Sequence, residues 1–193
     1  YKVPLIEDDP YGELRYGGEP LPPLKSFDQS GRVIYLSTFS KTIAPGLRLG
    51  WIVAGRELIR KLVLAKQGTD LHTGTLVQRA VQRYLENSDV SGHVRTIRKE
   101  YGRRRDIMLE EMRKNFPGRI SWTEPDGGMF LWVTLPEHFN SVQLLGKAIE
   151  KKVAYVPGAP FYPDGGGLNT LRLNFSNSTP GQIKNGIQRL ARL

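Results

Sequence analysis

The stretch that decides the fold is STFSKTIAPGLRLGW, from Ser37 to Trp51. In it, Lys41 lies among small hydroxyl residues and Arg48 follows on the same segment. The sequence Ala44-Pro45-Gly46 separates the two and cannot continue a helix. The runs on either side are apolar and β-forming: Val33 to Leu36 and Leu49 to Ala54. The pattern predicts a strand, a loop with an exposed lysine, and a second strand.

This loop has two interpretations. A lysine held between buried strands can act as a covalent amine nucleophile, and the nearby hydroxyls and Arg48 can hold a phosphate. Alternatively, Lys41 and Arg48 are ordinary surface cations. The segment alone does not separate the two, and the decision rests on the residues elsewhere.

The composition is that of an ordinary globular protein. The chain has 193 residues, 39% hydrophobic and 24% charged, enough for one large or two small domains. No apolar run approaches the ~20 residues of a membrane span. The absence of cysteine excludes disulfides and thiolate sites and fits a cytoplasmic protein. The histidines lie far apart, so no metal site is expected: His72, His93 and His138.

The chain begins at Tyr1 without a methionine and runs directly into a strand-like segment. We therefore expect it to be part of a longer protein.

The net charge of +9 raises the possibility of nucleic-acid binding. The basic residues are densest between Arg95 and Arg105, where they alternate with an apolar seam at helical spacing. A long helix with a solvated basic face accounts for them, so nucleic acid is not an expected partner of this segment.

The first half of the chain reads as α/β. Val3 to Ile6 is an apolar run that ends in Glu7-Asp8-Asp9-Pro10, so the strand should leave carboxylates at its C-terminal end, where open α/β sheets bind ligands. Three helices are then expected. They are a stripe from Leu58 to Ala65 closed by Gly68, a second from Leu76 to Leu85, and a long basic helix from Ser91 to Asn115.

The second half reads as α+β. Thr170 to Ser176 alternates, with Leu171, Leu173 and Phe175 on one side of the strand. The last helix should begin with a capping box of Thr179 and Gln182. The other predicted elements are strands at Arg119 to Thr123, Met129 to Leu135 and Val153 to Val156, a helix at Ser141 to Lys151, and a flexible loop at Gly165 to Gly167.

Five motifs in this order resemble the fold-type I pyridoxal-phosphate aminotransferases. The similarity is greatest to the 2-aminoadipate, aromatic and multi-substrate branch and to the aminotransferase-like domain of GntR/MocR regulators. The motifs span nearly the whole chain: EDDPYGEL (Glu7 to Leu14), STFSKTIAPGLRLGW, GGMFLWVTLP (Gly127 to Pro136), VPG (Val156 to Gly158) and LRLNFS (Leu171 to Ser176).

The resemblance implies a role for each matching residue. Lys41 corresponds to the lysine that forms a Schiff base with pyridoxal 5'-phosphate and later moves a proton on the substrate. Asp8 corresponds to the carboxylate beside the cofactor's pyridine nitrogen, and Tyr11 to the tyrosine that hydrogen-bonds its phenolic oxygen. Considered alone, Asp8 is a turn aspartate and Tyr11 a packing aromatic.

The same resemblance implies two anion sites. Arg48, Ser40 and Thr38 correspond to the clamp on the cofactor phosphate. Arg172 corresponds to the arginine that binds the substrate α-carboxylate bidentately, although alone it reads as a surface strand arginine.

The implied fold is α/β. Residues 1–90 would form the C-terminal part of the cofactor-binding large domain, with a mixed, mostly parallel sheet, and residues 91–193 a small α+β domain that starts with the long helix. The N-terminal half of the family fold, with its phosphate loop and cofactor-stacking aromatic residue, has no counterpart here. The family is dimeric, with sites shared across the interface, so we expect this chain alone to show weak or no catalysis.

Three functions follow from these observations. The first is an aminotransferase that moves an amino group from an amino acid to a 2-oxo acid. The second is the pyridoxal-phosphate-binding effector domain of a GntR/MocR-type transcription regulator, and the third is a nucleic-acid-binding module using the Arg95 to Arg105 face. The amino-acid substrate cannot be read from the sequence.

Overall fold

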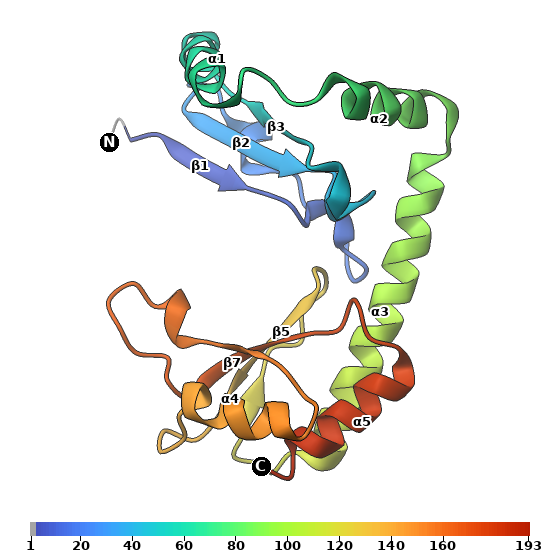
Figure 1. Cartoon of the computed structure of the whole chain (residues 1–193), viewed down its shortest axis with the longest axis vertical. Helices are drawn as coiled ribbons and strands as arrows, with labels where there is room; N and C mark the ends of the chain where they lie inside the picture. The colour runs from blue at the N-terminus through green and yellow to red at the C-terminus, as the bar shows by residue number, and fades with distance from the viewer. Residues whose placement is uncertain (1–2) are drawn as a thin grey trace. The chain divides into compact units, whose positions relative to one another are not determined.

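The computed structural model describes residues 3–193 of the chain (Figure 1). Tyr1 and Lys2, the start of the first predicted segment, lie outside the described residues. The chain forms two compact units, a first unit up to Ile97 and a second unit from Arg98 to Leu193. They meet in sequence within α3 (Val90–Asn115). The predicted domain boundary after residue 90 coincides with the start of this helix and stays a prediction.

The first unit is built on a three-stranded sheet of order β1-β2-β3. The strand β1 (Leu5–Asp8) pairs in parallel with β2 (Val33–Thr38), and β2 pairs antiparallel with β3 (Gly50–Val53). The short helices η1 (Gly12–Leu14) and η2 (Leu24–Phe27) lie between β1 and β2, and η3 (Pro45–Leu47) precedes β3. The predicted order of strand, lysine loop and strand is confirmed. Both boundaries of the first strand differ, because β1 begins at Leu5 and continues through Asp8, whereas the predicted strand ran from Val3 to Ile6.

Two amphipathic helices follow the sheet, α1 (Arg56–Asp70) and α2 (Thr75–Asn87), before α3 begins (Figure 1). The prediction that Gly68 closes the first helix is wrong. The helix passes through Gly68 and ends two residues later, where Leu71 takes a positive φ of 64°.

The second unit contains a four-stranded sheet of order β4-β5-β7-β6, in which every pair is antiparallel. Its strands are β4 (Ser121–Trp122), β5 (Phe130–Thr134), β6 (Val156–Pro157) and β7 (Thr170–Asn174). Leu171, Leu173 and Phe175 are all buried, as their alternation predicts. All four strands are shorter than predicted. The differences are largest for β4, because residues 119–120 and 123 are irregular, and for β6, because residues 153–155 are irregular and the strand continues to Pro157.

The helices of the second unit are α4 (Ser141–Glu150), the short η4 (Ala159–Phe161) and α5 (Pro180–Leu190), together with most of α3. The predicted capping box at α5 is present, with both the Thr179 and Gln182 side chains bonded to backbone N–H groups. At α4, Asn140 accepts hydrogen bonds from the amides of Val142 and Gln143 and caps the helix.

In residues 3–193, none of the helices combines the length and apolar character that crossing a membrane requires. The same residues contain no group of three or more His, Asp or Glu side chains able to hold a metal ion.

Candidate active site

Two of the three neighbouring acidic residues at the end of β1 are used to build the fold. Glu7 accepts hydrogen bonds from the amides of Leu24 and Lys25, at 2.7 and 2.9 Å. Asp9 accepts a bond from the Tyr35 hydroxyl at 3.0 Å. Both carboxylates are therefore fixed by intramolecular donors.

Asp8 differs from these two neighbours. It is the last residue of β1, its side chain is exposed, and it makes no hydrogen bond or ion pair with any described residue. Because successive residues of a strand point to opposite faces, Asp8 projects away from the side where Glu7 and Asp9 are bound. Of the three carboxylates, Asp8 is the one available to a ligand.

The loop after β2 holds Lys41 in a single tight turn. The Phe39 carbonyl accepts hydrogen bonds from the amides of Ile43 and Ala44, at 2.8 and 3.1 Å, and the Phe39 amide donates to the Leu49 carbonyl at 3.1 Å. Lys41 is half-buried in this loop.

The Lys41 amine lies 5.9 Å from the centroid of the Tyr11 ring. This distance is at the edge of the range of a cation–π contact. The amine makes no hydrogen bond or ion pair within the part of the chain that the structure describes. The fold thus brings Lys41 and Tyr11 together from different loops while leaving the amine available to an incoming group.

The two predicted phosphate-binding hydroxyls differ in their bonding. Thr38 Oγ1 donates to the Leu49 carbonyl at 2.7 Å, accepts from the Ser40 amide at 3.1 Å and lies 2.9 Å from Ser40 Oγ. A hydroxyl has one proton, so the Thr38 proton is already engaged in shaping the loop. Ser40 can rotate its own proton toward a ligand.

Arg48 is exposed and has left-handed backbone angles, φ 52° and ψ 35°. A non-glycine residue in this region is uncommon and costs on the order of 1 kcal/mol. Its guanidinium donates one hydrogen bond, to the Pro45 carbonyl at 3.2 Å. Most of the N–H groups of Arg48 therefore remain available for an anion next to the loop.

His93 contacts the lysine loop, and the sequence analysis did not predict this contact. Its Nε2 lies 3.0 Å from the Thr42 carbonyl, directly after Lys41, and so ties the start of α3 to the loop. The two residues are 51 positions apart, and no local spacing marks their contact.

Six predicted site residues therefore lie at one end of the first unit's sheet, near the C-terminal ends of β1 and β2: Asp8, Tyr11, Thr38, Ser40, Lys41 and Arg48. The seventh, Arg172, lies on β7 of the second unit, with its guanidinium carbon 4.1 Å from the centroid of the Phe130 ring. The six residues of the first unit supply an amine, a carboxylate and anion-binding donors, and Arg172 supplies a further set of donors in the second unit.

The sequence profile of the aminotransferase class I and II family matches residues 1–190. The chain belongs to this family. It is 48% identical over 191 residues to the aromatic-amino-acid aminotransferase 1 of Thermococcus litoralis, a match that covers 99% of this chain and 46% of that protein. It is also 32% identical to the uncharacterized HTH-type transcriptional regulator YisV of Bacillus subtilis, covering 98% of this chain and 39% of the regulator.

The class I and II fold is also seen in solved structures. The kynurenine aminotransferase of Pyrococcus horikoshii, in complex with PMP, superposes with a TM-score of 0.96 at 49% identity over 100% of this chain and 48% of that one. LysN, the α-aminoadipate aminotransferase of Thermus thermophilus complexed with N-(5'-phosphopyridoxyl)-L-leucine, gives 0.94 at 40% identity over 98% and 49%. The chain spans about half the length of the relatives it matches.

Proposed function

We propose that this chain is the lysine-bearing part of a pyridoxal-phosphate-dependent aminotransferase, which transfers an amino group from an amino acid to a 2-oxo acid. The observation that carries the proposal is a pair of groups at one end of the first unit's sheet, the Lys41 amine and the Asp8 carboxylate, which have no hydrogen-bond or ion-pair partner among the described residues. A half-buried lysine amine without such a partner suits a covalent nucleophile, and an exposed carboxylate beside it suits a cationic group of a ligand.

The residues present fit pyridoxal 5'-phosphate. The rotatable Ser40 hydroxyl and the Arg48 guanidinium suit a phosphate, with Thr38 shaping the loop that presents them. Asp8 suits a protonated ring nitrogen, and Tyr11 a phenolic oxygen. When bound, the cofactor supplies an aldehyde that takes up the amino group and a ring that withdraws electrons from the substrate α-carbon.

The chain's own residues would then divide the work. Lys41 is the nucleophilic amine and afterwards holds and moves a proton at the substrate α-carbon. Arg172 binds the α-carboxylate of the amino acid or 2-oxo acid through paired N–H donors. His93 holds the loop that carries Lys41.

The test is Lys41→Ala in the full polypeptide that contains this chain. We expect transamination to be abolished, and borohydride reduction with pyridoxal phosphate to leave no adduct on the peptide spanning residue 41. Lys61→Ala is the matched control, because Lys61 is an exposed lysine of α1. Undiminished transamination in Lys41→Ala would refute the proposal.

The similarity to the regulator YisV supports a second candidate, a pyridoxal-phosphate-binding effector domain. Both candidates use Lys41 to hold the cofactor, so the adduct does not separate them. Turnover does: an aminotransferase converts an amino acid and a 2-oxo acid in many cycles, whereas an effector domain binds cofactor without turnover.

We also propose that the chain works within a longer, cytoplasmic, homodimeric protein, with residues 1–90 in a large domain and 91–193 in a small one. Relatives about twice as long support the first point, and the lack of cysteine is consistent with the compartment. Sedimentation of the full polypeptide tests the dimer.

A further inference from the structure

The guanidinium of Arg172 lies close to two aromatic rings. Its central carbon is 4.1 Å from the centroid of the Phe130 ring and 5.0 Å from that of Phe161. Phe130 comes from β5 and Phe161 from η4. Both distances are well within the ~6 Å over which a ring face attracts a cation.

Arg172 has no other partner in the described part of the chain. It makes no hydrogen bond or ion pair there, and its Nε is buried without an acceptor. Two other arginines of the second unit show the contrast. Arg104 bonds to the Glu100 carboxylate and to the Ser176 carbonyl, and Arg105 to the Pro125 carbonyl. A buried unbonded N–H is costly unless a ligand supplies the acceptor.

The two rings attract the cation but offer its five N–H donors, which lie in one plane, no conventional acceptor. They therefore hold the guanidinium in place and leave its N–H groups without an acceptor among the described residues. A planar carboxylate that approaches in that plane can accept two parallel bonds.

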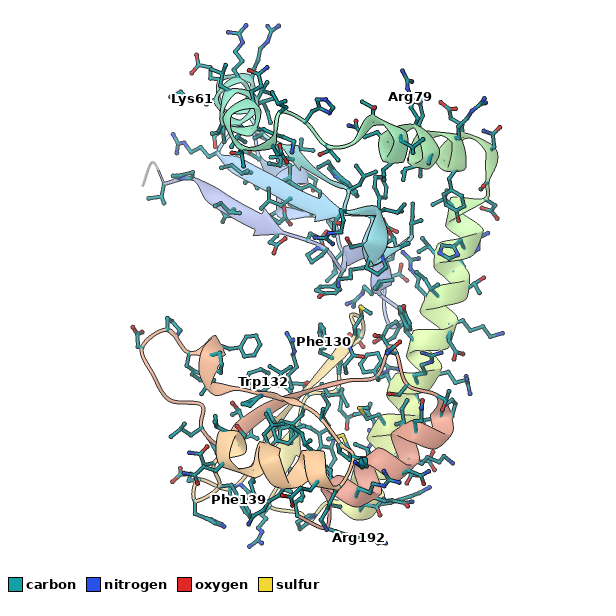
Figure 2. All side chains as sticks on the ribbon, viewed as in Figure 1. Lys61, Arg79, Phe130, Trp132, Phe139 and Arg192 are labelled. Atoms are coloured by element: carbon teal, nitrogen blue, oxygen red, sulfur yellow. The ribbon has the colours of Figure 1, made fainter. Side chains whose placement is uncertain are left out.

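The rings are themselves held in place. Trp132 is the residue opposite Arg172 in the β5·β7 register, and its side chain comes from the same strand as that of Phe130 (Figure 2). Its ring meets Phe161 edge to face, with centroids 5.3 Å apart and an interplanar angle of 88°. The turn leading into η4 is pinned to β7, because Gly158 donates to the Thr170 carbonyl and a Cβ at Gly158 would collide with the Thr170 side chain.

We propose that Phe130 and Phe161 are positioning residues that hold the Arg172 guanidinium as a preformed receptor for the substrate carboxylate. The proposal rests on the function proposed above. The rings replace the carboxylate or carbonyl partners that orient other arginines, so that the ligand is the first in-plane acceptor that Arg172 meets.

The kinetic test uses Phe130→Leu and Phe161→Leu in the full polypeptide with bound cofactor. Leucine keeps an apolar side chain but removes the ring face. We expect KM for the amino acid to rise about 3- to 30-fold, the range of a lost cation–π contact, with kcat changed less than about 2-fold. Phe130→Tyr and Phe161→Tyr keep the face and should restore KM. Phe139→Leu is the matched control, since Phe139 packs against His138 and lies away from Phe130 in the second unit (Figure 2).

A second substrate separates positioning from general damage. The decarboxylated amine with the same side chain offers no carboxylate to Arg172. Its single-turnover reaction with the cofactor-loaded protein, measured without a 2-oxo acid, should therefore be equally fast in wild type and in both leucine variants. An unchanged KM for the amino acid would overturn the proposal, and so would an equal loss with the amine.

An NMR experiment tests the position of the Arg172 guanidinium without an enzyme assay. In the full polypeptide labelled with ¹⁵N, the Arg172 Nε–H signal should be displaced by the ring currents of Phe130 and Phe161. The displacement should disappear in the leucine variants and persist in the tyrosine variants. If the full polypeptide shows no transamination, the proposed function fails, and this signal alone decides whether the rings orient Arg172. An undisplaced signal in the wild type would overturn the positioning.

Discussion

The two units are almost equal in length but differ in how they are held together. Of the fifteen buried hydrophobic residues in the described chain, twelve lie in the second unit and three in the first: Leu14, Val81 and Val94. The strands of the first unit expose aliphatic side chains instead, among them Ile6 at 65% and Val53 at 46%.

Lys41 and the residues around it thus lie in the unit that has the fewer buried hydrophobic side chains. The first unit, which carries Lys41, is ordered mainly by backbone pairing and by polar contacts such as those of Glu7, Asp9 and Thr38. Mixed α/β sheets normally cover both faces. If the longer polypeptide that we propose covers these strands, it should stabilise the first unit more than the second. The second unit should be the more stable of the two in this chain.

The largest expected difference in the free energy of unfolding is between two phenylalanine-to-alanine variants, one in each unit. Phe175→Ala removes a fully buried ring of the second unit and should lower the free energy of unfolding by about 3–5 kcal/mol. Phe27→Ala removes a ring of the first unit that is 67% exposed and should change it by less than ~0.5 kcal/mol. Urea unfolding of both variants measures the effects, and equal losses would contradict the comparison.

Much of the second unit could be predicted because its signals are local. The alternation of Leu171, Leu173 and Phe175 and the capping box at Thr179 are patterns within a few residues, and both are present in the structure. The wrong helix end at Gly68 has a different cause. A Cβ added at Gly68 would contact no other part of the described chain, so no close approach requires the helix to stop there, and the chain instead turns at Leu71, which has a positive φ of 64°.

The site could be predicted only in part, because its geometry depends on contacts between distant residues. The sequence placed three carboxylates in a row, but only the structure shows that Glu7 and Asp9 are bound and that Asp8 is not. The His93 contact with the lysine loop and the Phe161 contact with Arg172 cross between elements, and no periodicity encodes them.

Acid should weaken the first unit through Asp28, a smaller effect than the loss of Phe175. The Lys25 ammonium beside Asp28, together with the backbone amides of Val33 and Arg32, holds the pKa of this carboxyl well below its usual range. Its side chain is 2% exposed and bonds to Lys25 at 2.9 Å. A lowered pKa means that the stabilisation is complete above about pH 4 and is lost as the pH falls below that value.

Asp28→Asn should therefore flatten the acid dependence of stability below about pH 4. Hydrogen exchange of the peptide spanning β2, measured from pH 5 downwards, reports the loss of stability of the first unit in acid. Asp70→Asn is the control, because the Asp70 ion pair with Lys66 is about half exposed and contributes little. A variant as acid-sensitive as the wild type would show that other groups hold this region.

Alkali should act on the second unit, through Tyr155. Burial raises the pKa of Tyr155 to about 12, and its hydroxyl donates to the Ser141 carbonyl at 2.6 Å. A raised pKa means that this stabilisation is complete below about pH 10, the ordinary value for tyrosine, and is lost as the pH rises through about 12.

Tyr155→Phe keeps the ring in the core and removes only the hydrogen bond, so the expected cost at neutral pH is small, about 0.5–1.5 kcal/mol. The variant should also lose less stability than the wild type between pH 10 and 12, because it has no phenol to ionise. Tyr162→Phe, at a site that is 39% exposed, is the matched control and should follow the wild type. Parallel alkaline unfolding curves for all three proteins would mean that core packing, rather than this buried hydroxyl, decides how the second unit responds to pH.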